Sequence, residues 1–396
     1  MSTATAEARS TPVPTAPRGG LEGVVAATTR LSHVEGEAGR LTLAGHPLAE
    51  IAPHASCEEM AFLLWEDRLP KPDELAELRR ELVVHRTLPP AVLDLLRAAA
   101  GADPMDALRM GVAALDAGTD SKPAERTPRG DAVRLLAAVP SIVAAHHRLA
   151  AGLEPVAPRD DLDHAAAYLH QLTGAVPAPE RTRALATYLN TVSDHGLNAS
   201  TFTARVIVST GSDLVSAVAG AVGALKGPLH GGAPGPALDT VLEIGDASRA
   251  ETVLRQKLER GERLMGFGHR VYRVRDPRAD VLAAAAERLF ENGGGDRGLY
   301  RLALAVEQVA LRLLREHKPD RRLDTNVEFY TALLLHGLGL PAELFTPTFA
   351  VGRTAGWTAH ALEQAATGRL IRPAAEYSGT DDRRWVPVEE RDGRRL

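Results

Sequence analysis

Apolar residues recur every three or four positions along most of the chain after residue 52, which is the spacing of an amphipathic helix. Residues 73–84 show it clearly, with Leu75, Leu78 and Leu82 on one face. Asp103 and Pro104 form an N-cap and a first-turn proline, and we expect the helix they open to end near Gly118. Further helices are predicted over residues 130–151, 161–173, 180–194, 199–210, 213–225, 235–245, 249–260, 277–291, 299–316, 326–337 and 347–367.

Strand-like patterns are confined to the N-terminal part of the chain. Two short runs of β-tolerant residues, 21–29 and 40–44, are separated by glycine and charged residues. Pro140 falls inside a predicted helix and is expected to kink or divide it. Residues 119–130 and 292–298 are polar and contain glycine or proline, which predicts loops. The pattern as a whole predicts a large, mainly α protein with a few short N-terminal strands.

Composition and charge narrow the possible classes of function. The 396 residues include 46 basic and 51 acidic ones, and the formal net charge of -5 gives no overall attraction to nucleic acid or to an anionic membrane. Cys57 is the single cysteine, which excludes an internal disulfide and favours a cytoplasmic protein. No run of residues is apolar for long enough to span a membrane. Residues 1–19 have no amphipathic pattern, so a disordered tail is expected there.

Three histidines stand next to glycines in predicted turns or helix ends, namely His195, His230 and His269. Imidazole is the side chain best able to move protons near neutral pH, and glycine lets a backbone approach a ligand closely. A purely structural interpretation stays open for each. Gly196, for example, can end a helix and leave His195 at the C-terminal dipole. The sequence has no HExxH motif and no Cys/His cluster, so no metal is expected.

Glu328 and a group of arginines complete the candidate set. Glu328 follows Thr325 at the spacing of a capping box, in which the glutamate accepts from the Thr325 backbone N–H. Alternatively, a carboxylate near a helix N-terminus stays ionised and can act as a base. Guanidinium groups bind carboxylates and phosphates through paired hydrogen bonds, so the arginines suit a polyanionic ligand. The candidate arginines are Arg270, Arg273, Arg275, Arg278, Arg353 and Arg372.

Taken in order, these segments resemble the signature blocks of the citrate synthase family. The blocks are Ser193-Asp-His-Gly-Leu-Asn-Ala-Ser200, Gly227-Pro-Leu-His-Gly231, Gly266-Phe-Gly-His269 continuing to Asp276-Pro-Arg278, Asn326-Val-Glu-Phe329 and Phe349-Ala-Val-Gly-Arg353. The likeness extends over about residues 20 to 380, and several ordered blocks are far more specific than one.

The resemblance implies a citrate synthase-like, two-domain, all-helical fold. Residues 20–233 and 342–396 would form the large, dimer-forming domain, and residues 234–341 a small domain that carries CoA and the catalytic carboxylate. The chain lacks the extra N-terminal β-domain of the long hexameric members, which favours a homodimer. The implied substrates are oxaloacetate and an acyl-CoA. Acetyl-CoA would be a co-substrate, and no cofactor would be bound permanently.

The resemblance also assigns roles at the reacting atoms. Glu328 would remove a proton from the methyl group of the thioester, which is a very weak acid and needs its enol stabilised as it forms. His230 would donate a hydrogen bond to the thioester oxygen as a neutral imidazole. His269 would polarise and protonate the ketone oxygen of oxaloacetate.

Other residues would bind the substrates. Arg372 would reach oxaloacetate from the other subunit, and Arg273 would lie near the phosphates of CoA. The full set implied for oxaloacetate is His195, Arg278, Arg353 and Arg372.

The sequence departs from the family at the base, because Glu328 stands where aspartate is usual. The additional methylene moves the carboxylate by about 1.5 Å if nothing compensates, and a misplacement of about 1 Å can cost roughly 100-fold in rate. Citrate synthase is the leading interpretation. A 2-methylcitrate synthase that uses propionyl-CoA is the nearest alternative, since one methylene discriminates by only about 1 to 3 kcal/mol. An alternative of another class is a catalytically idle paralogue that still binds oxaloacetate and CoA.

Overall fold

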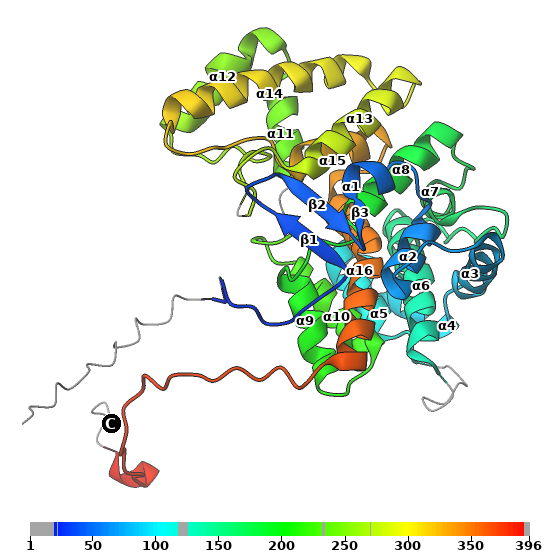
Figure 1. The fold of residues 1–396 in the computed structure, drawn as a ribbon, viewed down its shortest axis with the longest axis vertical. Coiled ribbons are helices and arrows are strands. Elements are labelled where there is room, and N and C mark those ends of the chain that lie inside the picture. The colour runs from blue at the N-terminus through cyan, green and yellow to red at the C-terminus, as the bar shows by residue number, and fades with distance from the viewer. Residues whose placement is uncertain (1–19, 22, 118–125, 232–233, 270, 392–396) are drawn as a thin grey trace, which may run out of the picture.

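The computed structural model describes residues 20–21, 23–117, 126–231, 234–269 and 271–391, and these residues are mainly helical (Figure 1). The predicted tail 1–19, Arg270 and part of the predicted loop 119–130 lie outside the described residues. The α-helices are α1 (Leu48–Ile51), α2 (Cys57–Glu66), α3 (Pro72–His85), α4 (Pro90–Ala98), α5 (Pro104–Ala113), α6 (Pro128–Ala150), α7 (His164–Thr173), α8 (Pro179–Thr191), α9 (Ala199–Ser209), α10 (Leu214–Leu225), α11 (Pro234–Ile244), α12 (Ala250–Glu259), α13 (Pro277–Glu291), α14 (Arg297–His317), α15 (Val327–Gly337) and α16 (Phe345–Thr367). The predicted mainly α class is confirmed.

Individual helices differ from the predictions where proline is involved. Helix α6 runs without a break through Pro140, so the expected division is wrong. Helices α2 and α4 were not predicted; in α4, Pro90 takes the first helical position, where its missing N–H costs nothing. Helix α5 ends at Ala113, earlier than the expected end near Gly118.

A small antiparallel sheet precedes the helices. Its strands β1 (Ser32–Glu35), β2 (Arg40–Leu43) and β3 (His46–Pro47) pair in sequence order, with Val34 opposite Leu41. The predicted strand at 40–44 is confirmed as β2, whereas the one at 21–29 is wrong. That segment pairs with no described strand, and Val24 and Val25 are 60% and 85% exposed, so it lacks the buried face that a strand needs.

The β1–β2 hairpin supports the loop that follows His269. The Arg273 N–H donates to the Gly36 carbonyl at 3.1 Å. A Cβ added to Gly36 would lie 2.5 Å from the Val271 carbonyl oxygen, so only glycine permits this approach. The hairpin therefore fixes one side of the loop.

Helix α16 is the central element. It packs against α2, α6, α8, α9 and α10, and it is buried on nearly all sides from Phe345 to Ala361 (Figure 1). A helix surrounded in this way has no solvent face on which to place a charge. A charged residue in the middle of α16 must therefore point into a site or meet a partner.

Helices α11 to α15 form the upper group in Figure 1. Within it α12 packs on α14, and α11 and α13 pack on α15. Helix α13 also packs on α8, which lies outside this group. The segments that carry His269 and Glu328 belong to this upper group and face α16 across the junction of the two groups.

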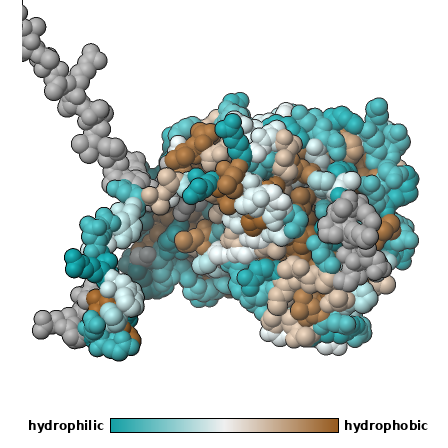
Figure 2. Space-filling model, turned by 90° about the horizontal axis from the view of Figure 1, so that it is seen from below, coloured by the Kyte–Doolittle hydropathy of each residue, from teal (hydrophilic) through white to brown (hydrophobic). Residues whose placement is uncertain are grey.

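The described C-terminal segment leaves the body after α16 in an extended conformation, on the same side as the N-terminal end (Figure 1). Figure 2 views this side and shows hydrophobic patches interspersed with hydrophilic residues. Among the described residues, no helix combines the length and apolar character needed to cross a bilayer.

Candidate active site

His195 lies in the turn between α8 and α9. Its Nε2 shares a hydrogen bond of 3.1 Å with the Tyr272 hydroxyl, and its ring centroid lies 5.8 Å from that of His269. Burial lowers the pKa of His195 well below its usual value, and the positive charges of Arg278 and Arg353 lower it further. Helix α8 already ends at Thr191, so the alternative in which Gly196 ends that helix is wrong. His195 is thus a neutral ring facing two cations.

The turn before His269 depends on two glycines. Gly266 and Gly268 have φ values of +89° and +79°, in the left-handed region. Their backbone joins the start of α15: the Gly268 N–H donates to the Asp324 carbonyl at 2.7 Å, and the Asn326 N–H donates to the Gly266 carbonyl at 2.9 Å. The His269 turn and the Glu328 helix are therefore one hydrogen-bonded unit.

His269 is surrounded by donors. Its Nδ1 accepts from the backbone N–H groups of Val271 and Tyr272 at 3.0 and 3.1 Å. The hydrogen-bond pattern therefore assigns the ring proton of the neutral form to Nε2. Nε2 lies 3.1 Å from Arg278 Nη2, which can only donate. An oxygen placed beside these two atoms would lie within reach of both.

Arg278 is held at the start of α13 by the helix N-cap, Asp276. The Asp276 carboxylate accepts from the Arg278 backbone N–H and Nε, each at 3.0 Å, and from Nη2 at 2.8 Å. Asp276 Oδ2 also accepts from the Val327 N–H at 3.2 Å. Burial alone would raise the pKa of Asp276, but Arg278 outweighs it and holds that pKa below its usual range. The buried pair therefore fixes the guanidinium next to the N-terminus of α15.

Glu328 occupies the first turn of α15. The N-cap is Asn326, whose Oδ1 accepts from the Glu328 N–H at 3.0 Å. The predicted capping box with Thr325 is wrong, since the Thr325 hydroxyl donates to Glu307 instead. Burial raises the pKa of Glu328, and Arg278 opposes this shift. The raised pKa makes Glu328 a stronger base than an exposed glutamate.

His230 follows α10 and contacts the first turn of α9. Its Nε2 lies 2.8 Å from the Ser200 hydroxyl and accepts from the Ser200 N–H at 3.3 Å. Trp357 Nε1 donates to the same hydroxyl at 3.0 Å. Burial lowers the pKa of His230 to about 4, and Arg353 adds to the shift. The ring is therefore neutral at physiological pH, and the contacts at Nε2 assign its proton to Nδ1.

Arg353 lies in the middle of α16 and is 1% exposed. Its Nε donates to the Val192 carbonyl, and its guanidinium lies 4.7 Å from the Phe349 ring centroid. Burial lowers its pKa to about 10, which Asp194 opposes. No carboxylate among the described residues lies within ion-pair distance of it. A buried cation without such a partner favours an anionic ligand.

Two predicted residues lie elsewhere in the chain. Arg372 is exposed in the extended segment after α16, next to the Ile371 N–H that donates to Ser209 Oγ at 3.0 Å. The Arg273 side chain is also exposed. The chain by itself brings together His195, His230, His269, Arg278, Glu328 and Arg353, which are connected through mutual charge effects on their pKa values.

A buried pair that the sequence did not suggest lies behind His195. His360, two turns after Arg353 on α16, accepts from Arg205 Nη1 at 2.9 Å through Nδ1. Its Nε2 then faces Asp194 Oδ1 at 3.1 Å, and both side chains are fully buried. A histidine seven positions after an arginine in an apolar helix was the signal available in the sequence.

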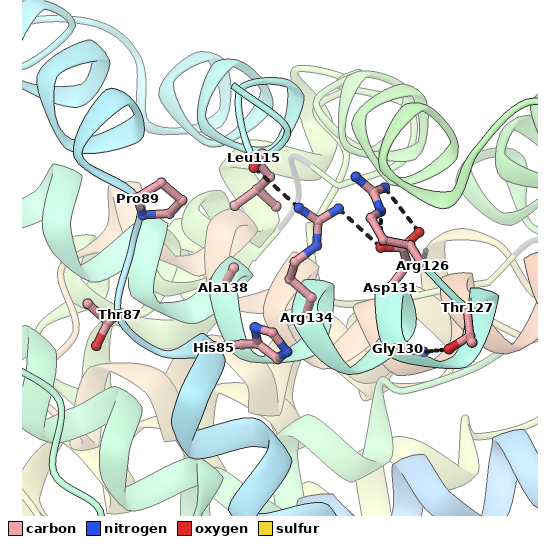
Figure 3. A pocket seen from close by; sticks show the side chains of 10 residues that line it. All are labelled: His85, Thr87, Pro89, Leu115, Arg126, Thr127, Gly130, Asp131, Arg134 and Ala138. Carbon is pink, nitrogen blue, oxygen red and sulfur yellow. Dashed lines mark hydrogen bonds and ion pairs between the residues drawn. The ribbon is translucent and has the colours of Figure 1, made fainter. Parts of the chain in front are cut away.

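A separate cavity of about 360 Å³ lies beside α3, α5 and α6, and none of the candidate residues lines it (Figure 3). Its arginines, Arg126 and Arg134, both pair with Asp131, at 3.0 and 3.2 Å, and with Asp116, at 2.7 Å each. Because these charges are already paired, the described residues of the cavity offer no free arginine to an anionic substrate.

Comparisons with known proteins agree on one family. Residues 20–374 match the family model described as citrate synthase, C-terminal domain. The chain is 43% identical over 377 residues to citrate synthase 2 of Bacillus subtilis, covering 94% of this chain and 98% of that protein. It is 40% identical over 375 residues to 2-methylcitrate synthase of Shewanella oneidensis, covering 94% and 97%. The crystal structure of citrate synthase from Pyrobaculum aerophilum matches with a TM-score of 0.86 at 38% identity, covering 94% of each chain.

Proposed function

Because the chain belongs to the citrate synthase family, we propose that it condenses acetyl-CoA with oxaloacetate and hydrolyses the citryl-CoA formed to citrate and CoA. The observation that carries this proposal is the convergence of two donors, His269 Nε2 and Arg278 Nη2, at 3.1 Å, close to the buried Arg353. An oxo-dicarboxylate offers the oxygens that such donors need.

The residues that face the thioester have the acid–base properties the reaction requires. Glu328 is the base, and the rise of its pKa by burial favours proton abstraction from a weakly acidic methyl group. His230 is neutral because its pKa is about 4, so its Nδ1–H donates to the thioester oxygen without requiring an imidazolium. His269 then gives the Nε2 proton to the ketone oxygen as the new carbon–carbon bond forms.

Oxaloacetate binds between the two helical groups. Arg353 and His195 contact it from the α16 side, and Arg278 from the α13 side. Arg372 completes the site from a second copy of the chain, since it is exposed within its own.

A homodimer is supported by the outer face of α10. Ser216, Ala219 and Gly223 lie one turn apart on this face and are at least partly exposed. Such small residues let another helix approach closely.

The domain boundaries are proposed at residues 233 and 342. The grouping of α11 to α15 supports a small domain over 234–341 that closes on residues 20–233 and 342–396. Arg273 is exposed at this junction and would meet the CoA phosphates. The single buried Cys57 supports the proposed cytoplasmic location.

The direct test uses the purified protein. Release of free CoA from acetyl-CoA with oxaloacetate is expected, and it should depend on both substrates. A catalytically idle binding protein would release none. A clear preference for propionyl-CoA would instead assign a 2-methylcitrate synthase, the name carried by the Shewanella oneidensis relative.

A further inference from the structure

A buried carboxylate on α14 joins the two segments that carry His269 and Glu328. Glu307 is 7% exposed in the middle of α14, whose one other acidic residue, Glu316, is exposed. It accepts from Arg275 Nη1 at 2.7 Å, from the Thr325 hydroxyl at 2.6 Å and from the Tyr330 hydroxyl at 2.5 Å. Three donors thus meet one carboxylate.

The position of these donors in the chain is informative. Thr325 and Tyr330 flank Glu328 at the start of α15, and Arg275 lies between His269 and Arg278. Glu307 therefore contacts a residue on each side of Glu328 and connects this turn to the loop that follows His269. The Arg275 guanidinium also lies 5.8 Å from the centroid of the Tyr330 ring, so the contact involves packing as well as charge.

We infer that Glu307 is a positioning residue for the condensation: it sets the distance between the Glu328 carboxylate and the groups that receive the nucleophile, without touching substrate itself. This inference rests on the proposed function. The additional methylene of Glu328 gives its carboxylate more freedom than an aspartate has, and the Glu307 contacts restrict the backbone on either side of it.

Replacing the acceptor tests this role. Glu307→Gln keeps the shape but substitutes a donor for one acceptor oxygen, so at least one of the three hydrogen bonds is lost. We expect kcat for CoA release to fall by about 10- to 100-fold, because a misplaced group reacts more slowly. The KM for oxaloacetate should change by less than about threefold, since Arg353 and His195 lie outside the Glu307 contacts.

An isotope effect separates positioning from stability. With methyl-deuterated acetyl-CoA, the isotope effect on kcat should be larger in Glu307→Gln than in the wild type, because proton abstraction becomes slower relative to later steps. The matched control is Glu316→Gln on the same helix, where the carboxylate is exposed and pairs with Arg312 at 3.1 Å. This control should behave as the wild type.

Second variants keep the test decisive if Glu307→Gln does not fold. Tyr330→Phe and Thr325→Val each remove one donor, and both should lower kcat, whereas Thr325→Ser should restore it because the hydroxyl returns. A folded Glu307→Gln, or folded Tyr330→Phe and Thr325→Val, with wild-type kcat and isotope effect would overturn the inference while leaving the proposed function intact. A wild type that releases no CoA would overturn the proposed function and the inference with it.

Discussion

His269 Nε2 lies 3.1 Å from Arg278 Nη2, and two backbone N–H groups at Nδ1 assign the proton to the nitrogen that faces the arginine. The two nitrogens lie within hydrogen-bond distance of each other, and whether the histidine nitrogen accepts depends on its tautomer. Oxaloacetate offers both a ketone oxygen and carboxylates, which are the groups that a guanidinium beside an imidazole can bind.

The shared site gives a prediction about mixed dimers. Arg353→Ala and Arg372→Ala should each abolish most activity, since each removes a cation that we propose binds oxaloacetate. When the two inactive variants are unfolded together and refolded, half of the dimers are mixed, and each mixed dimer contains one intact site. Activity should return to about a quarter of the wild-type value.

The result of this experiment depends on which subunit's site Arg372 serves. If it served the site of its own chain, each mixed dimer would contain two sites with one defect each, and mixing would restore nothing. Refolded samples of either variant alone serve as the control.

The turn before His269 gives a prediction about glycine. Gly266→Ala places a Cβ 3.0 Å from Phe329 Cβ at a φ of +89°, so we expect a loss of about 1–3 kcal/mol in unfolding free energy and a fall in kcat of at least about tenfold. Gly261→Ala is the matched control, with a φ of +74° and no heavy atom within 4 Å of the added Cβ. It should cost about 1 kcal/mol of backbone strain and leave kcat unchanged. Equal kcat values in the two variants would contradict the steric argument.

Buried, neutral histidines are expected to make the stability of the fold sensitive to acid. Burial, with a further contribution from Arg86, lowers the pKa of His164 to about 3, against about 6.5 in the unfolded chain. Between these values the unfolded chain binds the proton, so stability is present above pH 6.5 and falls as the pH drops toward 3. From pH 7.5 to 5.5 His164 accounts for a loss of about 1 kcal/mol in unfolding free energy.

Denaturant unfolding at the two pH values checks this, at one protein concentration. His164→Gln should lose less stability over this step than the wild type, by about 1 kcal/mol. If His164→Gln and the wild type lose the same stability between the two pH values, His164 is protonated in the folded protein.

Much of the fold could be predicted from the sequence because α-helical periodicity is local information. The errors arise where tertiary contacts decide. Val24 and Val25 have strand-forming side chains, but none of the described strands pairs with them. Pro140 remains within α6 because the surrounding helices bury that position on all sides.

The candidate site could likewise be predicted where local sequence information suffices, and not where tertiary contacts decide. Glycine-flanked histidines could be found by inspection, because glycine marks a turn at any position. The contact between Thr325 and Glu307 could not be found in this way, since a capping box at residues 325–328 fits the local pattern equally well. Only the packing of α14 on this turn excludes the capping box. The pair of His360 and Asp194 likewise joins positions 166 residues apart, and no local pattern connects them.

The central claim is that Glu328 is the base despite its additional methylene, and one substitution tests it most directly. Glu328→Gln keeps the size of the side chain and removes the negative charge. CoA release from acetyl-CoA and oxaloacetate, measured together with oxaloacetate binding by calorimetry, should be fast in the wild type and fall by at least about 1000-fold in the variant, with binding retained. Equal CoA release by the two proteins would contradict the account.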